Sequence, residues 1–265
     1  MNPLAVITGA SSGIGAEFAR GLAARGYDCV VTARREDRLR SLADELEAKY
    51  EVSVTVIAAD LGTAGGAEQL YRRVQELDRP VTFLVNNAGF GLYGHFVRHE
   101  PAKLQQMVQL NMVSLTTLTH LFTRDMVALG RGRVLQVASV GAFQPSPYYA
   151  VYSATKSYVR DFSQALHWEL RGSGVTVSTI CPGLTETEFH EVADHIKPSY
   201  LDAATMTAHS VAEIGIRGAL RGRAHITPGV INKLMGWMIK LTPRSVATWL
   251  AGVSMASDAT RAPTP

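Results

Sequence analysis

The stretch LAVITGASSGIG, residues 4–15, decides the fold that this sequence predicts. Its first five residues are apolar or β-branched, as is typical of a strand buried on both faces. The glycine-rich turn that follows ends the strand and opens a helix, so backbone N–H groups and the positive end of the helix dipole point toward the turn. This unit is typical of a pyrophosphate site in a dinucleotide-binding protein. The residues expected to line it are Gly9, Ser11, Ser12, Gly13, Ile14 and Gly15.

The glycines follow the spacing G-x-x-x-G-x-G, which differs from the G-x-G-x-x-G of many dinucleotide binders. Glycines also serve tight turns that bind no ligand. The position of this turn, directly between a strand and a helix, favours nucleotide binding over the plain turn.

Short apolar runs alternate with segments of helical periodicity along nearly the whole chain. The expected strands are 4–8, 28–33, 53–59, 81–86, 133–138, 175–181 and 224–227. The expected helices are 14–25, 36–49, 64–77, 101–129, 153–171 and 207–221. This alternation predicts an α/β fold with a Rossmann-type, doubly wound parallel sheet of about seven strands and helices on both faces. No repeat or Pro/Gly-rich linker divides the chain, so residues 1–265 are expected to form one domain.

The composition is that of a soluble globular protein, with 46% hydrophobic and 18% charged residues and a formal net charge of +3. Its arginines are scattered without interleaved aromatic residues, which argues against a nucleic-acid partner. The two cysteines lie in apolar runs, as buried thiols in a reducing compartment would. The first residues show no signal peptide and no apolar run is long enough to span a bilayer, so we expect a cytoplasmic protein.

The end of the second strand indicates which dinucleotide is bound. An NAD-binding protein usually places an acidic residue there, whereas this chain has Ala33, Arg34 and Arg35. A guanidinium group suits the 2′-phosphate of NADP(H), so we expect NADP(H) to be favoured and NAD(H) to remain possible. The alternative is that both arginines are solvated and neutralised by Glu36 and Asp37. Arg34→Ala is expected to raise the KM for NADPH far more than the KM for NADH.

Further polar residues follow the strands at the carboxyl edge, where sheets of this kind bind ligands. Asn86-Asn87-Ala88-Gly89 closes the fourth strand, Ser139 follows the fifth, and the stretch YYAVYSATKSY at 148–158 begins the next helix. Tyr152 and Lys156 stand four residues apart and share one helix face.

Taken together, these motifs resemble the short-chain dehydrogenase/reductase family. The family pattern matches at Thr8–Gly15, Asn86–Gly89, Asn111, Ser139 and Tyr152–Lys156, with Pro182-Gly183 as a further match, and the resemblance runs from about residue 4 to about 230. It implies hydride transfer between a nicotinamide cofactor and a carbonyl or alcohol. The catalytic residues that it implies are Asn111, Ser139, Tyr152 and Lys156. The expected cofactor contacts also include Asp60, Leu61, Asn87, Ala88, Gly89, Tyr152, Lys156, Pro182, Gly183 and Thr185.

The chemistry explains why a tyrosine and a lysine would be paired. Free tyrosine, with a pKa near ~10, is a poor base at neutral pH. An ammonium group ~4 Å away at an effective dielectric constant of ~20 contributes about 4 kcal/mol, or roughly three pKa units as an upper limit. We therefore expect Lys156 to bring the pKa of Tyr152 near the working pH, and Ser139 to hydrogen-bond the substrate oxygen. By resemblance, Lys156 also binds the nicotinamide ribose, and Asn111 holds a water that links Lys156 to solvent.

The expected substrate pocket is apolar, which suits a lipophilic ketone, aldehyde or secondary alcohol. Its candidate residues are Phe90, Leu92, Tyr93, Phe96, Phe143, Tyr149, Leu184, Phe189, Val192 and Ile196, and the alternative is that half of them are core. Tyr148 and Tyr158 are expected to pack or lie on the surface. In this family the segment at about 184–206 forms a lid, and the nearest resemblance is to hydroxysteroid dehydrogenases and 3-oxoacyl reductases.

Other functions are disfavoured by the sequence. HEVADH at 190–195 puts its second histidine at i+5, off the helix face that zinc binding requires, so no metal site is expected. A catalytically silent NADP(H)-binding sensor or scaffold would need a damaged site, and no motif residue is missing. A nucleotide-sugar epimerase would share Y-x-x-x-K but normally shows a different glycine spacing and a longer C-terminal domain.

Two expectations concern surfaces. By resemblance, we expect a homodimer or homotetramer formed by the helices at 101–129 and 153–171, with Leu118, Phe122, Phe162 and Trp168 either at the interface or in the monomer core. The segment 230–253 is apolar on nearly all faces and should be broken at Pro243. It could form the outer wall of the pocket, a subunit contact or a peripheral membrane contact, of which the first two are favoured. Residues 257–265 are expected to be disordered.

Overall fold

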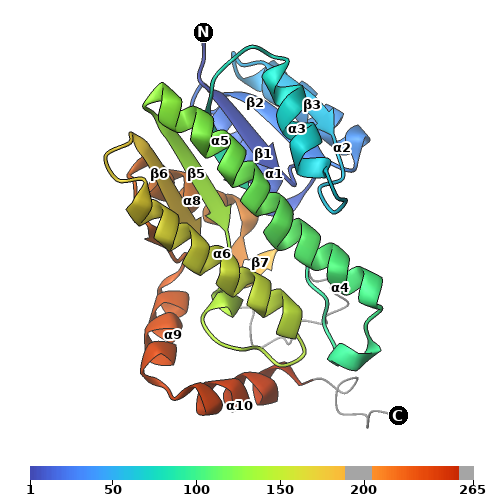
Figure 1. Cartoon of the computed structure of the whole chain (residues 1–265), viewed down its shortest axis with the longest axis vertical. Coiled ribbons are helices and arrows are strands. Elements are labelled where there is room, and N and C mark those ends of the chain that lie inside the picture. The colour runs from blue at the N-terminus through green and yellow to red at the C-terminus, as the bar shows by residue number, and fades with distance from the viewer. Residues whose placement is uncertain (189–204, 257–265) are drawn as a thin grey trace.

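Seven parallel strands form the central sheet, in the order β3–β2–β1–β4–β5–β6–β9 (Figure 1). The computed structural model describes residues 1–188 and 205–256. The strands are β1 Leu4–Thr8, β2 Asp28–Ala33, β3 Val54–Ala58, β4 Val81–Asn86, β5 Gly132–Val137, β6 Val175–Ile180 and β9 His225–Ile226. These bounds confirm the predicted strands to within two residues, and with them the predicted fold class.

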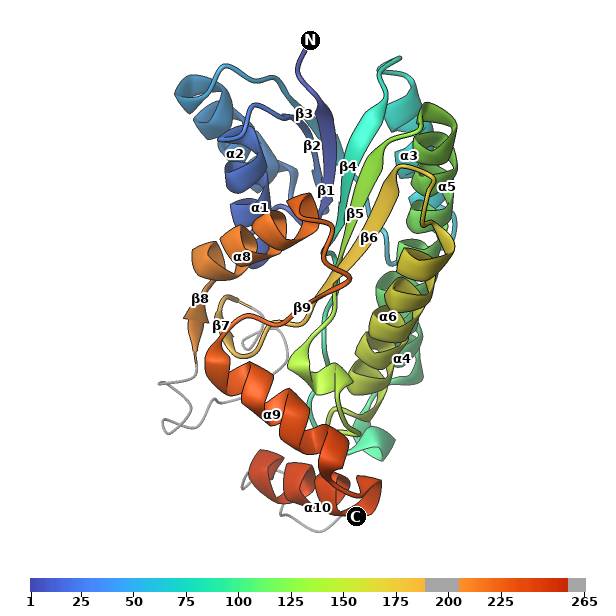
Figure 2. The same ribbon diagram turned by 90° about the vertical axis from the view of Figure 1, so that its left-hand side faces the viewer.

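Helices cover both faces of the sheet (Figure 2). On one face lie α1 Gly13–Ala23, α2 Glu36–Lys49 and α8 Ala208–Leu220. On the other lie α3 Gly66–Gln75, α4 Pro101–Val108, α5 Leu115–Leu129 and α6 Ala150–Glu169. The strands are thereby buried on both sides, which explains why their sequences are nearly continuous apolar runs.

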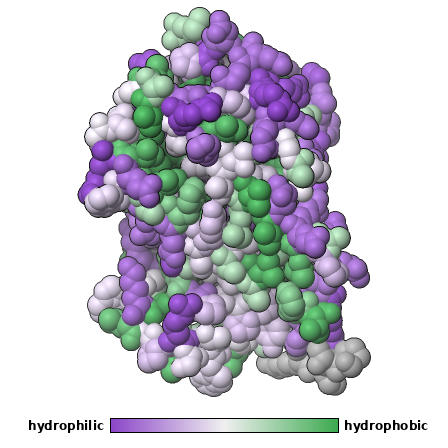
Figure 3. Space-filling model, viewed as in Figure 1, coloured by the Kyte–Doolittle hydropathy of each residue, from purple (hydrophilic) through white to green (hydrophobic). Residues whose placement is uncertain are grey.

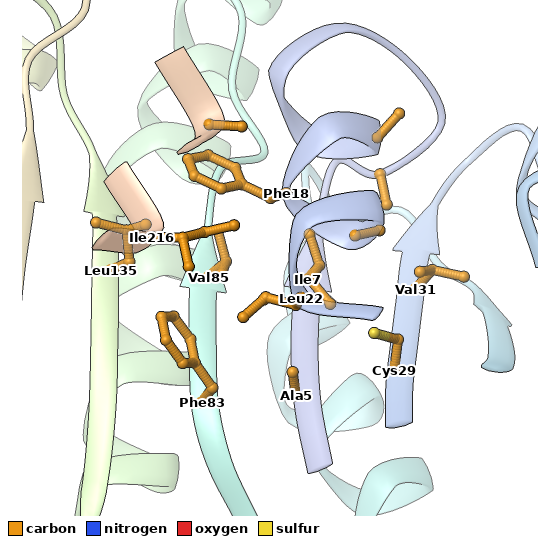
Figure 4. Close-up of a cluster of buried hydrophobic side chains, with 14 of the residues drawn as sticks. Ala5, Ile7, Phe18, Leu22, Cys29, Val31, Phe83, Val85, Leu135 and Ile216 are labelled. Atoms are coloured by element: carbon orange, nitrogen blue, oxygen red, sulfur yellow. The ribbon is translucent and has the colours of Figure 1, made fainter. Parts of the chain in front are cut away.

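The core beneath α1 and α8 shows how the layers are joined (Figure 4). Phe18 of α1 and Ile216 of α8 lie against Val85 of the sheet, and all three side chains are fully buried. On the opposite face, Leu118 and Phe122 of α5 are each only 1% exposed and pack on the sheet. They belong to the monomer core, because side chains with so little exposed surface have none left for a subunit interface.

The C-terminal segment forms two helices beyond the carboxyl edge of the sheet, α9 Val230–Leu241 and α10 Arg244–Met255 (Figures 1 and 2). Pro243 lies between them, so the predicted break is confirmed. A short parallel pair, β7 Thr185–Glu186 and β8 Met206–Thr207, joins the two ends of the expected lid. Residues 189–204 of that lid and the tail 257–265 lie outside the described residues.

Candidate active site

One large cavity lies at the carboxyl edge of the sheet, with a volume of about 770 Å³. It extends from the glycine-rich turn after β1, past Ser139 and Tyr152, to the side of α9. Every residue that the sequence predicts at the cofactor lines this cavity, from Gly9 through Asp60, Leu61 and Asn87 to Thr185. The topology explains why: the parallel strands end at the same edge, so their following loops meet there.

The glycine-rich turn is clamped to the loop after β4. The Thr8 hydroxyl oxygen accepts hydrogen bonds from the backbone N–H groups of Asn87 and Ala88, both at 3.0 Å. A Cβ at Gly15 would lie 2.1 Å from the carbonyl oxygen of Gly9, so only glycine fits there. Gly9 itself has a φ of +69°, a conformation that L side chains rarely adopt. The turn is thus a bare backbone cradle of the kind that accepts a pyrophosphate.

The arginines at the end of β2 are in different surroundings. Arg35 donates to the hydroxyl oxygens of Ser12, at 2.7 Å, and Ser11, and forms an ion pair with Glu188 at 2.9 Å. Arg38 of α2 pairs with the same carboxylate. Both arginines line the cavity and are exposed to solvent, and they differ in that these hydrogen bonds and ion pairs are made by Arg35. Arg35, rather than Arg34, is therefore the guanidinium group held beside the glycine-rich turn.

Glu188 was not expected at this site from the sequence, because it lies 153 residues from Arg35. Hydrogen bonds from Arg38 and Arg35 lower the pKa of its carboxyl group to about 2. The carboxylate therefore supplies a negative charge to two arginines beside the turn. Arg35, one of the two arginines that the sequence predicts at the 2′-phosphate, is thus paired with an acidic side chain in this structure.

Ser139 and Tyr152 are brought together as predicted, and a hydrogen bond joins their side chains. Burial raises the pKa of Tyr152 to about 12, and the bond from Ser139 opposes this shift. The expectation that Lys156 brings the pKa of this phenol near neutrality is therefore wrong for the structure. Removal from water disfavours the phenolate more than its surroundings favour it, and the Lys156 Nζ atom lies 5.8 Å from the centre of the tyrosine ring.

Lys156 is buried, and its ammonium group donates to the carbonyl oxygen of Val137 at 2.8 Å. Burial lowers its pKa to about 8, because desolvation disfavours the charged form. Lys156 and Tyr152 are one turn apart on α6, and both line the cavity.

Asn111 lies behind the cavity wall, in a π-helical turn at Gln109–Ser114 between α4 and α5. Its amide donates to the carbonyl oxygen of Phe90 and to the Thr155 hydroxyl, and its Oδ1 accepts from the N–H of Phe90. A Cβ at Gly89 would lie 2.9 Å from Asn111 Oδ1 and 3.4 Å from Lys156 Nζ, so both groups gather around this glycine. Both amide hydrogens are used, and only Oδ1 keeps a lone pair for the water that the resemblance implies.

The substrate candidates divide into two groups. Phe90, Tyr149 and Leu184 line the cavity. Tyr93 lies behind Tyr149, with ring centres 5.1 Å apart, and its hydroxyl donates to the carbonyl oxygen of Met255. Phe143 packs under Gly236 of α9, where a Cβ would lie 2.8 Å from its ring. Leu92 and Phe96 are also outside the cavity lining, and Phe96 is exposed.

The wall opposite Tyr149 comes from α9, which no motif marks in the sequence. Ile231, Asn232, Met235 and Ile239 line the cavity from this helix. Asn232 is 5% exposed and donates to the carbonyl oxygen of Pro228 at 2.9 Å. Asn232, an uncharged polar residue in a largely apolar segment, was the available signal for a buried polar contact.

The remaining predicted positions cannot be placed. Phe189, Val192, Ile196 and the HEVADH segment lie outside the described residues. Within residues 1–188 and 205–256, no cluster of histidine, cysteine and acidic side chains could hold a metal ion. In that same part of the chain, no helix is both long and apolar enough to cross a membrane.

Comparison with known proteins places this site in a family. The family model for short chain dehydrogenases matches residues 3–196. The very-long-chain 3-oxoacyl-CoA reductase of Anas platyrhynchos is 30% identical over 247 residues, covering 91% of this chain and 76% of that protein. Sulfoacetaldehyde reductase 2 of Chromohalobacter salexigens is 33% identical over 221 residues, covering 81% of this chain and 87% of that protein. A short-chain dehydrogenase from Sphingobium yanoikuyae, solved in complex with NADPH, has a TM-score of 0.80 at 30% identity over 98% of both chains.

Proposed function

The chain belongs to the short-chain dehydrogenase/reductase family, and on that premise we propose that it interconverts a lipophilic ketone or aldehyde and the corresponding alcohol with NADP(H). Membership of the family makes the protein an oxidoreductase that acts on CH–OH groups. One observation carries the proposal further. The hydrogen-bonded Ser139–Tyr152 pair and Lys156 line the same cavity as the glycine cradle, so a dinucleotide and a carbonyl would meet there.

Tyr152 is the proposed proton donor in the direction of reduction. When bound, NADPH supplies the hydride. With its pKa raised to about 12, the phenol of Tyr152 stays protonated at neutral pH and holds a proton ready for the developing alkoxide. The Ser139 hydroxyl lies within hydrogen-bond reach of Tyr152, so both can point at one substrate oxygen. In the reverse direction the same burial is a handicap, because the phenolate must form before it can accept a proton.

Lys156 has the proposed role of positioning and charging this centre. Its pKa of about 8 leaves it mostly protonated at neutral pH, so it supplies a positive charge beside the site. The bond to Val137 and the neighbouring Asn111 fix its direction. An ammonium group held in this way can donate to a ribose hydroxyl and favour negative charge that develops on Tyr152.

NADP(H) is proposed over NAD(H) because of the arginines beside the turn. The Arg35 fork, held by Ser11 and Ser12, matches the bidentate geometry that phosphate oxygens prefer. Glu188 already places an anion against Arg35 and Arg38, so these groups accept negative charge in the folded protein. The solved relative that carries NADPH supports this preference.

A lipophilic substrate is proposed from the far wall of the cavity. Phe90, Leu184, Ile231, Met235 and Ile239 give that end apolar surface, which a bulky acyl or ring system can bury. The 3-oxoacyl-CoA reductases among the relatives support a substrate of this kind. The resemblance to sulfoacetaldehyde reductase supports a second candidate, a small polar aldehyde. The apolar α9 wall favours the first.

A carbonyl panel tests the proposal. NADPH oxidation would be followed by absorbance with a long-chain 3-oxoacyl thioester, a steroid ketone, a diaryl ketone and sulfoacetaldehyde. We expect kcat/KM for at least one bulky ketone to exceed that for sulfoacetaldehyde by about 100-fold or more. The reverse order would favour the polar aldehyde. Binding of NADPH without turnover of any carbonyl would favour a catalytically silent sensor.

Homo-oligomer formation through α4, α5 and α6 is a further part of the proposal. Trp168 on α6 is 65% exposed, and Val113, next to α5, is 47% exposed. Figure 3 shows a band of hydrophobic residues that runs across the lower part of α5 toward the turn at 96–98. Light scattering at micromolar concentration is expected to give at least the mass of a dimer, and a monomeric mass would remove this part of the proposal.

A further inference from the structure

The outer surface of α9 and α10 is apolar and exposed. Most of the exposed large hydrophobic side chains in the described residues lie on these two helices. They are Val230, Ile231, Leu234, Met235, Trp237, Met238, Leu241, Val246, Trp249, Leu250 and Val253. Trp237 and Trp249 are 61% and 65% exposed. In Figure 3 part of this surface is seen as hydrophobic residues at the lower left margin, where α9 lies. A concentration of exposed apolar side chains of this kind is typical of a binding site rather than of a solvated face.

The exposed apolar side chains form one stripe on each helix. On α9, Val230, Leu234, Trp237 and Leu241 repeat at the spacing of one helix face. The opposite face carries Asn232, Gly236 and Ile239, which contact the body of the protein or line the cavity. On α10, Val246, Trp249, Leu250 and Val253 likewise share a face, while Ala247 and Ala251 are buried. Each helix therefore uses one face for the protein and leaves the other unpartnered.

The charges on this surface have one sign. Residues 230–256 contain Lys233, Lys240 and Arg244 and no acidic residue. All three cations are exposed, and the two lysines border the apolar stripe of α9. Lysines in that position can bury their alkyl stems and extend their ammonium groups to anionic headgroups. Exposed tryptophans beside apolar and basic residues are typical of helices that lie in a membrane interface.

The length of the helices fits the same surface. Each has 12 residues, or about 18 Å, against a hydrocarbon core of about 30 Å. They are too short to span a bilayer, in agreement with the absence of a spanning helix from the described part of the chain. Two short amphipathic helices joined at Pro243 can instead lie flat, with the apolar stripes in the acyl region and the cations among headgroups.

We propose that the outer face of α9 and α10 binds the surface of a membrane that contains anionic lipids. Since Met235 and Ile239 of α9 line the cavity, binding in this way sets the apolar end of the cavity next to the lipid. A lipophilic substrate dissolved in the bilayer would then reach the cavity without crossing water. The membrane contact does not depend on the proposed reaction, so its test needs no substrate.

Flotation with vesicles tests the contact directly. The full chain would be mixed with equimolar phosphatidylglycerol and phosphatidylcholine, or with phosphatidylcholine alone. We expect the protein to float with the anionic vesicles, with the bound fraction falling at about 0.5 M salt because the cations are screened. Trp237→Ser/Trp249→Ser should reduce partitioning by about ten-fold or more. Trp168→Ser, which removes an equally exposed tryptophan from α6, is the matched control and should leave partitioning unchanged.

The contribution of the lysines and the insertion of the tryptophans into the membrane are measured separately. Lys233→Glu/Lys240→Glu should reduce binding to anionic vesicles, while Lys49→Glu/Arg72→Glu, on α2 and α3, should leave it unchanged. The chain has three tryptophans, so in a Trp168→Phe background the fluorescence reports only on α9 and α10 and should shift to the blue on vesicles. NADPH binding and thermal unfolding confirm that each variant is folded.

Two outcomes would overturn the proposal. One is a wild-type protein that ignores both kinds of vesicle. The other is that the wild type does not float and that Trp237→Ser/Trp249→Ser has a smaller mass than the wild type in light scattering. That result would assign the face to a second copy of this chain.

Discussion

The two ends of the cavity differ in the residues that form them and in how those residues are held. At the cofactor end, polar groups are held by hydrogen bonds and an ion pair: the Thr8 hydroxyl binds the loop after β4, and the Arg35 side chain binds two serine hydroxyls and a carboxylate. At the α9 end, apolar side chains form the wall, and the same helix exposes Leu234 and Trp237 on its outer face. The cofactor end should therefore tolerate few amino-acid substitutions, whereas the α9 end should tolerate many.

This difference separates two tasks: the cofactor end carries the reaction, and the α9 end determines which substrate is bound. The reaction needs a defined proton donor and a defined cradle, so single atoms matter at the cofactor end. Recognition of a lipophilic substrate needs area and shape, which many side chains can share. Substitutions should therefore have large effects at the cofactor end and small effects at the α9 end.

The largest effect is expected from Tyr152→Phe. Loss of the hydroxyl removes the proton that reduction requires, so kcat should fall by about 10³-fold, while the Kd for NADPH should stay within about two-fold. Tyr149→Phe is the control, since Tyr149 also lines the cavity but has no proposed proton role. Steady-state kinetics and fluorescence titration measure the two quantities. If Tyr152→Phe kept more than a few per cent of the wild-type rate, the general-acid role would be wrong.

The free energy of unfolding should depend on pH through the buried ammonium group of Lys156. Its pKa is about 8 in the folded protein, below the ordinary 10.5, so between these values the unfolded chain binds a proton that the folded chain lacks. Its contribution to the free energy of unfolding therefore rises with pH across this window. Relative to Lys156→Met, the wild type should gain about 2 kcal/mol between pH 7.5 and pH 9.5.

Urea unfolding of both proteins at the two pH values measures this gain. The raised pKa values of Tyr152 and Cys29 act in the opposite direction at high pH but are common to both proteins. The raised pKa of Cys181 acts in the same way, but the charge of Lys156 partly lowers it, so this contribution differs between the two proteins. A stability difference that does not change with pH would mean that Lys156 titrates normally in the folded state.

Within the cofactor end, Arg35 and Arg34 should contribute unequally to the preference for NADPH over NADH. Arg35→Ala should reduce the preference for NADPH over NADH by about 30-fold, or roughly 2 kcal/mol, because a charge-assisted pair of hydrogen bonds to phosphate is lost. Arg34→Ala should also lower that preference but by less, because the hydrogen bonds to Ser11 and Ser12 beside the turn are made by Arg35. The change in preference is measured from the KM values of each variant for NADPH and for NADH. Equal losses for NADPH and NADH in both variants would remove the 2′-phosphate site.

The smallest effect is expected at the α9 end. Met235→Ala should raise the KM for a bulky ketone by about five-fold and leave kcat within about two-fold, because it removes apolar area without touching the reacting groups. Met238→Ala, three residues on and outside the cavity lining, is the matched control. A fall in kcat as large as that of Tyr152→Phe would show that the two ends are not separate.

The cofactor end could be predicted from the sequence because its parts are local. Strand ends, a glycine turn and the Tyr152–Lys156 pair are set within a few residues, and the parallel topology brings them to one edge. Glu188 could not be predicted, since its contact with Arg35 depends on how a distant segment folds back. The pKa of Tyr152 was missed because it depends on burial, which distance along a helix does not report.

The sequence predicted the segment 230–253 as a candidate outer wall of the pocket, but not which of its residues meet the cavity. Phe143 was expected in the pocket because it follows Ser139, yet it supports Gly236 of α9 from below. Ile231 and Met235 belong to an apolar segment in which every residue is a plausible core residue. Only the packed structure shows which face of that helix meets the cavity.

The central claim is that this chain transfers a hydride from NADPH directly to a carbonyl carbon beside Tyr152. The measurement that tests it is single-turnover reduction of the best ketone of the panel with NADPH deuterated at C4 on the transferred face, followed by mass spectrometry of the alcohol. The account predicts one deuterium on the carbinol carbon with the wild type and almost none formed over the same time with Tyr152→Phe. An alcohol without deuterium, or equal deuterium transfer by Tyr152→Phe, would contradict it.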